Sequence, residues 1–172
     1  LGLDPSTYPH RFNTFEKIVA HAKGLTFSLD SPQHSIRRIE FDAYLLERCG
    51  ADVRTHNVRQ IERDGADFVV DGVFRAPYLV GAGGTRCPVY RELFRELNPR
   101  ARELQAATLE HEFAYDWEDP RCHLWFFDHG LPGYTWYVPK QNGYLNLGVG
   151  GMADKMKPVS YTHLRAHETL HY

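Results

Sequence analysis

The sequence lacks several features that would identify whole classes of protein. No apolar run among its 172 residues approaches the length of a membrane span, and no charged-then-apolar leader opens the chain. The formal net charge is only -2, so no excess of positive charge is present to attract nucleic acid. We therefore expect a globular, cytoplasmic protein with a small-molecule ligand, whose membrane contact, if it has one, is peripheral.

Cysteine is also scarce. Cys49, Cys87 and Cys122 lie far apart and form no metal-type pair, which predicts reduced thiols and no metal site. The chain opens with Leu1 and not with Met, from which we expect a missing natural start. With 42% hydrophobic residues, it is long enough to bury the core of one ordinary domain.

A glycine-rich stretch organises the middle of the chain. The apolar run 78–82 has no polar alternation, which is typical of a strand buried on both faces. Gly81, Gly83 and Gly84 then lead into a helix-like segment at 91–97. Glycines at such a junction let a ligand approach the main chain, and the amides of a helix start suit a phosphate. An ordinary turn explains the same pattern equally well.

The region before this stretch predicts mixed structure. Residues 12–22 have helical spacing and 25–29 suit a strand, while 35–49 form a clearer helix that Gly50 ends. Arg37 and Arg38 at that helix start are disfavoured by the helix dipole, which favours an anionic ligand nearby. Short strands then follow at 53–55, 58–63 and 67–71, with turns at Asp64-Gly65 and Asp71-Gly72.

The region after Pro99 is rich in aromatic residues. Four strands with aromatic faces are predicted at 109–117, 123–129, 134–139 and 144–149. An antiparallel sheet of this kind could line an apolar pocket, and ordinary packing in a sandwich core is the alternative. His111, His123 and His129 lie on these strands, and a core or surface role suits them better than catalysis.

Three motifs, in this order, resemble the geranylgeranyl reductase family of FAD-dependent oxidoreductases, which shares its fold with para-hydroxybenzoate hydroxylase. Residues 38–42 with Leu45 resemble the family's R-x-x-F-D-x-x-L helix, and 80–86 resemble its G-A-D-G segment. Residues 134–139, followed by Gly148 and Gly150, resemble the pocket signature Y-x-W-x-F-P with its trailing G-x-G. The resemblance spans about Ser35 to Gly151.

The resemblance implies an α/β (α+β) fold: a partial FAD-binding, Rossmann-like domain with a β-meander, plus an antiparallel substrate-domain sheet. It also implies FAD as the cofactor, with NAD(P)H or a reduced electron carrier as donor. The residues implied to bind the cofactor are Arg38, Gly81, Ala82, Gly83, Gly84, Thr85 and Arg86. Those implied to bind an apolar prenyl or lipid substrate are Tyr134, Trp136, Tyr137, Pro139, Gly148 and Gly150. No catalytic proton donor is assigned.

The sequence departs from the family pattern at several points. Gly83 replaces the usual aspartate, so that position offers no carboxylate to a ribose hydroxyl, and Val138 replaces a phenylalanine of the pocket. No G-x-G-x-x-G motif for the FAD pyrophosphate occurs in the sequence, and the downstream segment that closes over the flavin is also missing. We therefore expect a truncated fragment that binds FAD weakly or not at all.

These features predict three parts. Residues 1–108 would form the partial FAD-binding domain and 109–158 the partial substrate-binding sheet. Residues 159–172 resemble a translated sequencing adapter and are interpreted as a non-native tail, with a terminal amphipathic helix as the alternative.

The function predicted for the parent enzyme is reduction of prenyl double bonds by a flavin. A flavin-dependent monooxygenase or halogenase of the same fold is the second reading. The third is an inert fragment or a lipid-binding module without redox activity.

Overall fold

The computed structural model describes residues 4–101, 103 and 105–156, so the predicted tail at 159–172 lies outside the described residues. The chain divides into two compact units, one formed by Leu1–Ala51 with Glu103–Tyr172 and the other by Asp52–Arg102. Strands that precede Asp52 and strands that follow Arg102 enter one sheet, and the domain boundary expected at 108 stays a prediction. No helix in the described residues is long and apolar enough to cross a membrane.

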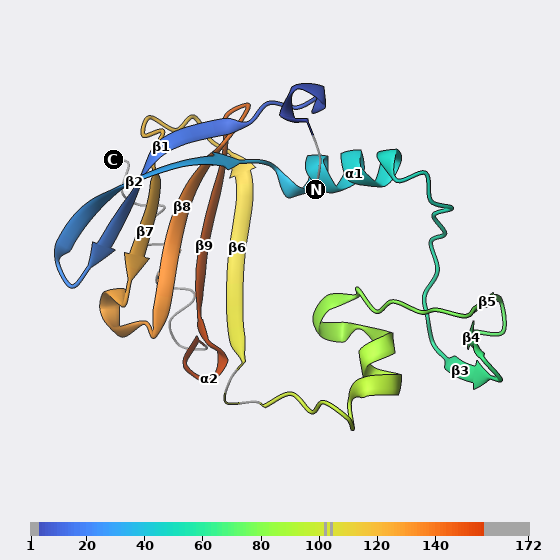
Figure 1. Cartoon of the computed structure of the whole chain (residues 1–172). Helices are drawn as coiled ribbons and strands as arrows, with labels where there is room; N and C mark the ends of the chain where they lie inside the picture. The colour runs from blue at the N-terminus through green and yellow to red at the C-terminus, as the bar shows by residue number, and fades with distance from the viewer. Residues whose placement is uncertain (1–3, 102, 104, 157–172) are drawn as a thin grey trace. The chain divides into compact units, whose positions relative to one another are not determined.

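A mixed sheet of six strands forms the first unit, in the order β2-β1-β7-β8-β9-β6 (Figure 1). β1 and β7 pair in parallel, and the other neighbouring strands pair antiparallel. The strands are β1 (Asn13–Ala22), β2 (Leu25–Ser35), β6 (Ala106–Ala114), β7 (Cys122–Phe126), β8 (Gly133–Lys140) and β9 (Tyr144–Met152). The four predicted aromatic strands are thus confirmed, and so is the α/β fold class.

The helix predicted at 12–22 is wrong, because this segment is strand β1. Its apolar residues Phe15 and Val19 are four apart, and that spacing keeps two side chains on one face of a strand as well as of a helix. Both are buried in the sheet. Hydrogen bonding to β2 on one side and β7 on the other decides between the two conformations.

One face of the sheet carries the core of this unit, and we call it the core face. Leu131, Val149 and Met156 form a buried cluster there, and Met156 comes from the short helix α2 (Ala153–Met156). Two buried hydrogen bonds from Asn13 and Ser35 converge on the Pro139 carbonyl, at 2.9 and 2.6 Å. They join the ends of β1 and β2 to the end of β8, although these strands are not neighbours.

Helix α1 (Arg38–Arg48) confirms the helix predicted at 35–49. It ends as expected, because Gly50 adopts a positive φ of 62° that glycine tolerates without strain. Tyr44 is buried on this helix, and its ring lies 5.1 Å from that of Tyr8.

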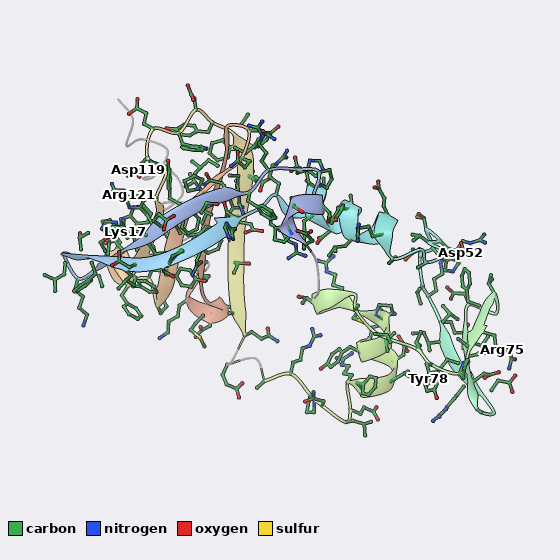
Figure 2. All side chains as sticks on the ribbon, turned by 45° about the horizontal axis from the view of Figure 1, so that its top comes forward. Lys17, Asp52, Arg75, Tyr78, Asp119 and Arg121 are labelled. Carbon is green, nitrogen blue, oxygen red and sulfur yellow. The ribbon has the colours of Figure 1, made fainter. Side chains whose placement is uncertain are left out.

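The second unit contains a small antiparallel sheet of β3 (Ile61–Asp64), β4 (Asp67–Val70) and β5 (Phe74–Ala76). Both predicted turns are confirmed, and Gly65 and Gly72 have positive φ in them. Arg75 on β5, labelled in Figure 2, forms ion pairs with Asp64 and Asp67. The strand predicted at 53–55 is wrong, since these residues have no regular structure.

Candidate functional site

The face of the sheet opposite the core face brings together residues of the third motif from β8 and β9. Trp136 on β8 pairs with Gly148 on β9, and Gly148 pairs with Glu110 on β6. Residues that pair directly across strands share a face of a sheet. We call this face the tryptophan face; it carries, among others, Glu110, Glu112, Tyr134, Trp136, Asn146, Gly148 and Gly150.

The G-x-G motif holds the indole of Trp136. A Cβ atom at Gly148 would lie only 2.0 Å from Cζ2 of Trp136, and one at Gly150 would lie 3.4 Å from Cζ3. Any larger residue at 148 would therefore displace the ring. The indole Nε1 donates a hydrogen bond of 2.6 Å to Oδ1 of Asn146, which fixes the orientation of the ring. The spacing between Trp136 and the two glycines thus has a structural reason.

A set of charged contacts joins the start of α1 to the same sheet. Arg37 donates to Glu112 at 2.7 Å, and its guanidinium lies 3.6 Å from the centre of the Tyr144 ring. The hydrogen bond to Glu112 raises the pKa of Arg37. Lys140 donates to the Ile36 carbonyl at 2.7 Å, and burial lowers the pKa of its ammonium group. These contacts place the first turn of α1 beside β6 and β9.

Arg38 lines a hollow of roughly 300 Å³ at this junction. The other residues that line it are Ile39, Glu110, Glu112, Lys140 and Asn146. Arg38 is 81% exposed and pairs with Asp42 at 3.0 Å, a contact that raises the pKa of the guanidinium. The first and third motifs therefore meet here, because Asn146 both lines the hollow and binds Trp136.

The tryptophan face becomes apolar towards the other edge of the sheet. The rings of Tyr134 and Phe126 lie 5.5 Å apart, next to Trp136. Leu25, Phe27 and Leu29 of β2 are exposed and pair with alternate residues of β1 that lie on this same face. Exposed apolar side chains gathered on one face of a sheet are typical of a binding site. The tryptophan face thus has a polar hollow near β6 and exposed apolar side chains near β2.

Two residues predicted to bind the substrate lie on the opposite side of the sheet. Tyr137 and Pro139 alternate with Trp136 along β8, so their side chains point to the core face. The hydroxyl of Tyr137 donates to the Asp119 carbonyl at 3.1 Å, and burial raises its pKa to about 12. Pro139 is fully buried. Both side chains are on the face opposite Trp136. Their predicted contact with the substrate stays a prediction, and their position does not support it.

The glycine-rich segment belongs to the second unit, and the buried strand predicted at 78–82 is wrong. These residues have no regular structure, and Tyr78 and Val80 are 85% and 84% exposed (Figure 2). A strand buried on both faces needs strands beside it and cover on both sides. Within the described residues, no strand pairs with this run. The helical segment that follows is a π-helix at Tyr90–Phe94.

The bend at Gly81 is folded tightly on its own chain. A Cβ atom at Gly81 would lie 2.7 Å from Cβ of Val89 and 3.0 Å from the Cys87 sulfur. Cys87 is buried, as expected, and backbone hydrogen bonds from Tyr90 and Gly83 lower the pKa of its thiol. Gly84 has a φ of 65°, opens the short 3-10 helix Gly84–Arg86 and has open space around it.

A hollow of roughly 380 Å³ lies against this bend. Gly81, Ala82 and Gly84 line it together with Arg100, whose guanidinium also donates to the Thr85 carbonyl at 2.7 Å. The bend thus offers main-chain groups and one cation to a ligand. The assignment of 81–86 to cofactor binding stays a prediction.

Comparison with known proteins shows the fold. No protein-family model matches the sequence. The structure is similar to that of PqsL from Pseudomonas aeruginosa, which is described as a probable FAD-dependent monooxygenase, with a TM-score of 0.63 and 13% identity over 92% of this chain and 49% of that one. It is also similar to the flavin-dependent halogenase CmlS (TM-score 0.58, 16% identity, 91% of this chain and 33% of that one). A triple mutant of the flavin-dependent brominase Bmp2 matches with a TM-score of 0.55 and 18% identity, over 84% and 42% of the two chains.

The chain therefore has the fold of part of these flavin-dependent enzymes, and it spans about half or less of their length. Kinship with geranylgeranyl reductases in particular remains a resemblance of motifs. Sequence reasoning missed Glu110, Glu112, Lys140 and Asn146, all of which line the hollow beside Arg38. In the sequence these residues are marked only by their alternation with apolar residues along β6, β8 and β9. That alternation does not predict that helix α1 lies next to them.

Proposed function

We propose that this chain is part of an FAD-dependent monooxygenase or halogenase and that its tryptophan face binds an apolar substrate. The proposal rests on the arrangement of that face. Exposed apolar side chains lie on one side of Trp136, and a hollow lined by charged residues lies on the other. The fold of PqsL, CmlS and Bmp2 supports the flavin part of the proposal. The proposal thus favours oxygen chemistry over the prenyl reduction that the motifs suggest.

The residues at the glycine bend fit an anionic nucleotide. The hollow there exposes main-chain groups of Gly81, Ala82 and Gly84, and the absence of a side chain at Gly84 leaves the approach open. We propose that residues 81–86 contact the FAD. Arg38, which belongs to the other compact unit, is proposed separately as a cation for the cofactor or the substrate. When bound, FAD supplies the transfer of electrons to oxygen or to the substrate.

The chain's own residues bind and orient the substrate. Asn146 holds the Trp136 indole in one orientation, so that the ring offers a fixed apolar contact. Tyr134 and Phe126 extend that contact, and burial of apolar surface provides most of the binding free energy. Arg38 and Lys140 supply positive charge at the polar end, and Glu110 and Glu112 supply negative charge, so this end suits a polar group of the ligand.

Reduction of a prenyl double bond is the second candidate. The motif at residues 134–139 with Gly148 and Gly150 favours it, although the contact between Trp136 and Gly148 also explains that spacing. In that case NAD(P)H or a reduced electron carrier would supply the electrons. A lipid-binding module without redox activity is the outcome if no flavin binds.

The decisive experiment purifies the protein from its genomic reading frame and records flavin absorbance and turnover. A yellow protein that consumes oxygen when reduced with an apolar substrate present supports the monooxygenase, and halide-dependent product supports the halogenase. Saturation of a prenyl substrate under anaerobic conditions supports the reductase. A colourless protein, or a frame that begins cleanly at Leu1 without a glycine-rich βαβ start, removes the oxidoreductase proposal.

A matched pair of variants tests the role of Arg38. Arg38→Met removes a cation that pairs with Asp42, and Arg54→Met removes an exposed arginine that pairs with Asp52 in the same way. We expect Arg38→Met to weaken flavin or substrate binding by up to about tenfold, since one charge-assisted contact to the ligand is lost. Arg54→Met should leave binding unchanged. Equal effects of the two variants would mean that Arg38 has no special role.

A further inference from the structure

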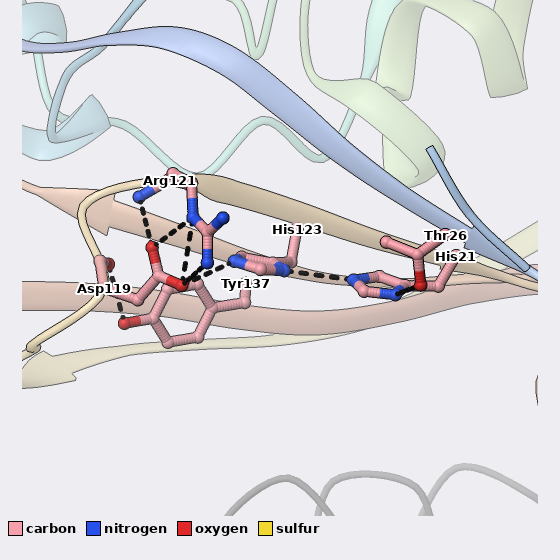
Figure 3. Close-up of polar contacts among 6 residues, drawn as sticks. All are labelled: His21, Thr26, Asp119, Arg121, His123 and Tyr137. Carbon is pink, nitrogen blue, oxygen red and sulfur yellow. Dashed lines mark hydrogen bonds and ion pairs between the residues drawn. The ribbon is translucent and has the colours of Figure 1, made fainter. Parts of the chain in front are cut away.

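A line of polar side chains on the core face has no part in the proposed flavin chemistry. It begins at Thr26 on β2, whose Oγ1 lies 3.1 Å from Nδ1 of His21 on β1. Nε2 of His21 lies 3.1 Å from Nδ1 of His123 on β7, and Nε2 of His123 lies 3.0 Å from Oδ2 of Asp119. Figure 3 shows the four groups joined end to end across three strands.

The direction of these hydrogen bonds follows from the ionisation of Asp119. Arg121 binds this carboxylate at 2.6 Å and strongly lowers its pKa, so Asp119 accepts the proton of His123. A neutral imidazole has one donor and one acceptor nitrogen, so His123 then accepts from His21. His21 in turn accepts the hydroxyl proton of Thr26. The unprotonated nitrogen of His21 therefore faces the only hydroxyl in the line.

The two imidazoles are held rigidly by aromatic neighbours. Trp125 packs against both of them on the same face, with its ring 4.9 Å from that of His21 and 5.5 Å from that of His123. All three rings are stacked. Tyr137 packs its edge against His123, and its hydroxyl donates to the Asp119 carbonyl. A base oriented in this way is the arrangement that activates a nucleophilic hydroxyl.

A hollow of roughly 170 Å³ opens beside Thr26 at the turn between β1 and β2. His21, Lys23, Thr26, Trp125 and Asp128 are among the residues that line it. An apolar cavity of about 150 Å³ accommodates benzene, so a small acyl group fits this volume. Burial is the main cause that lowers the pKa of His21, His123 and Arg121 lower it further, and Asp128 opposes them. His21 is thus a free base at neutral pH.

We propose that Thr26 is a nucleophile and His21 its general base, and that this site hydrolyses small acyl esters independently of any flavin. Oγ1 of Thr26 attacks the ester carbonyl carbon while its proton passes to Nδ1 of His21. The bond to the leaving alcohol breaks, and His21 returns the proton to that oxygen. Water, deprotonated by His21, then attacks the acyl carbon; the bond to Oγ1 of Thr26 breaks, His21 returns the proton to Oγ1, and the acid is released. Lys23, which lines the hollow, supplies positive charge for the oxyanion.

The test treats the full chain with para-nitrophenyl acetate and measures both nitrophenolate release and the acetylated peptide by mass spectrometry. We expect the acetyl group on Thr26. Thr26→Val and His21→Gln should each lower release by about a hundredfold or more, the usual contribution of a general base. Thr26→Ser should remain active, because it keeps the hydroxyl.

The chain offers a matched control on the same two strands. Thr14 and His34 form a threonine-histidine pair at 2.9 Å, and no hydrogen bond from His34 to a further histidine or carboxylate occurs among the described residues. Thr14→Val and His34→Gln should therefore leave the reaction unchanged. Asp119→Asn tests a positioning residue and should lower kcat more than it changes KM. It should also move the acid limb of the pH profile to lower pH, because a negative charge beside the imidazoles is lost.

Three outcomes would overturn this inference. They are acetylation confined to lysines or to Thr14, release that is as fast in Thr26→Val as in the parent chain, and release at the rate of buffer alone. Far-UV circular dichroism of each variant shows whether the sheet is intact, and Thr26→Ser separates loss of the hydroxyl from loss of the fold. None of these readouts depends on FAD, so failure of the flavin proposal would leave the test unaffected.

Discussion

The contact between Trp136 and Gly148 makes a quantitative prediction for Gly148→Ala. The new Cβ atom would lie 2.0 Å from Cζ2 and 2.2 Å from Cε2 of the indole, which is far inside van der Waals contact. Gly148 lies within the sheet between Trp136 and Glu110, so its backbone is held on both sides. The indole must therefore move, and its hydrogen bond to Asn146 is lost.

The expected cost follows from these two effects. Overpacking costs about 1–3 kcal/mol, and loss of the hydrogen bond costs about 0.5–1.5 kcal/mol. The smaller entropy of the unfolded alanine chain offsets about 0.4–1 kcal/mol. The net loss in the free energy of unfolding should therefore lie at roughly 0.5–4 kcal/mol, with a central value of about 2 kcal/mol. Gly150→Ala is the matched control, because its Cβ would meet Thr108 at 3.2 Å and Trp136 at 3.4 Å.

The assay is urea unfolding followed by far-UV circular dichroism. We expect Gly150→Ala to change the free energy of unfolding by less than about 1 kcal/mol, since its neighbours need to shift only slightly. A second substitution, Trp136→Leu, should abolish most of the cost of Gly148→Ala, because the clashing ring is gone. Equal costs for the two glycine variants, or no relief by Trp136→Leu, would refute the placement of the indole.

Three other predictions concern ionisation. The pKa of His21 is lower in the folded chain than its ordinary value of 6.5. Below pH 6.5 the unfolded state therefore binds this proton more readily than the folded state does. The free energy of unfolding should fall as the pH drops from 6.5 through the folded pKa. The pKa of Asp119 is also lowered, so its contribution to the free energy of unfolding is complete above pH 3.8 and is lost on further acidification. In urea unfolding over a pH series, Asp119→Asn should therefore reduce the fall in the free energy of unfolding at acidic pH. Burial raises the pKa of Cys122 to about 11, so iodoacetamide at neutral pH should modify the exposed Cys49 and spare Cys122. Equal modification of both thiols in peptide mapping would contradict the buried position of Cys122.

Local patterns in the sequence were sufficient for elements that depend on near neighbours. The turns at Gly65 and Gly72 and the end of α1 at Gly50 need a positive φ, which glycine provides at little cost. The aromatic strands β6 to β9 follow one another along the chain, and turns between them are marked by glycine, proline and asparagine. Each of these features is encoded within about ten residues.

Patterns that fit two structures were decided by partners elsewhere in the chain. The spacing of Phe15 and Val19 suits a helix or a strand, and pairing of β1 with β7, about a hundred residues away, selects the strand. The apolar run at 78–82 suits a buried strand, but no strand pairs with it among the described residues. The periodicity of apolar residues predicts which side chains will be buried, but it does not predict which part of the chain will pack against them.

The sequence by itself determined the four aromatic strands β6 to β9, the end of α1 at Gly50, and the presence of Trp136 with its two glycines. Only the tertiary structure decided that Gly148 receives the indole, that Asn146 joins Trp136 to the hollow beside Arg38, and that His21 meets His123. The physical reason is that lateral pairing in a sheet brings together residues that are distant in sequence. Which strands become neighbours depends on the free energy of the whole sheet.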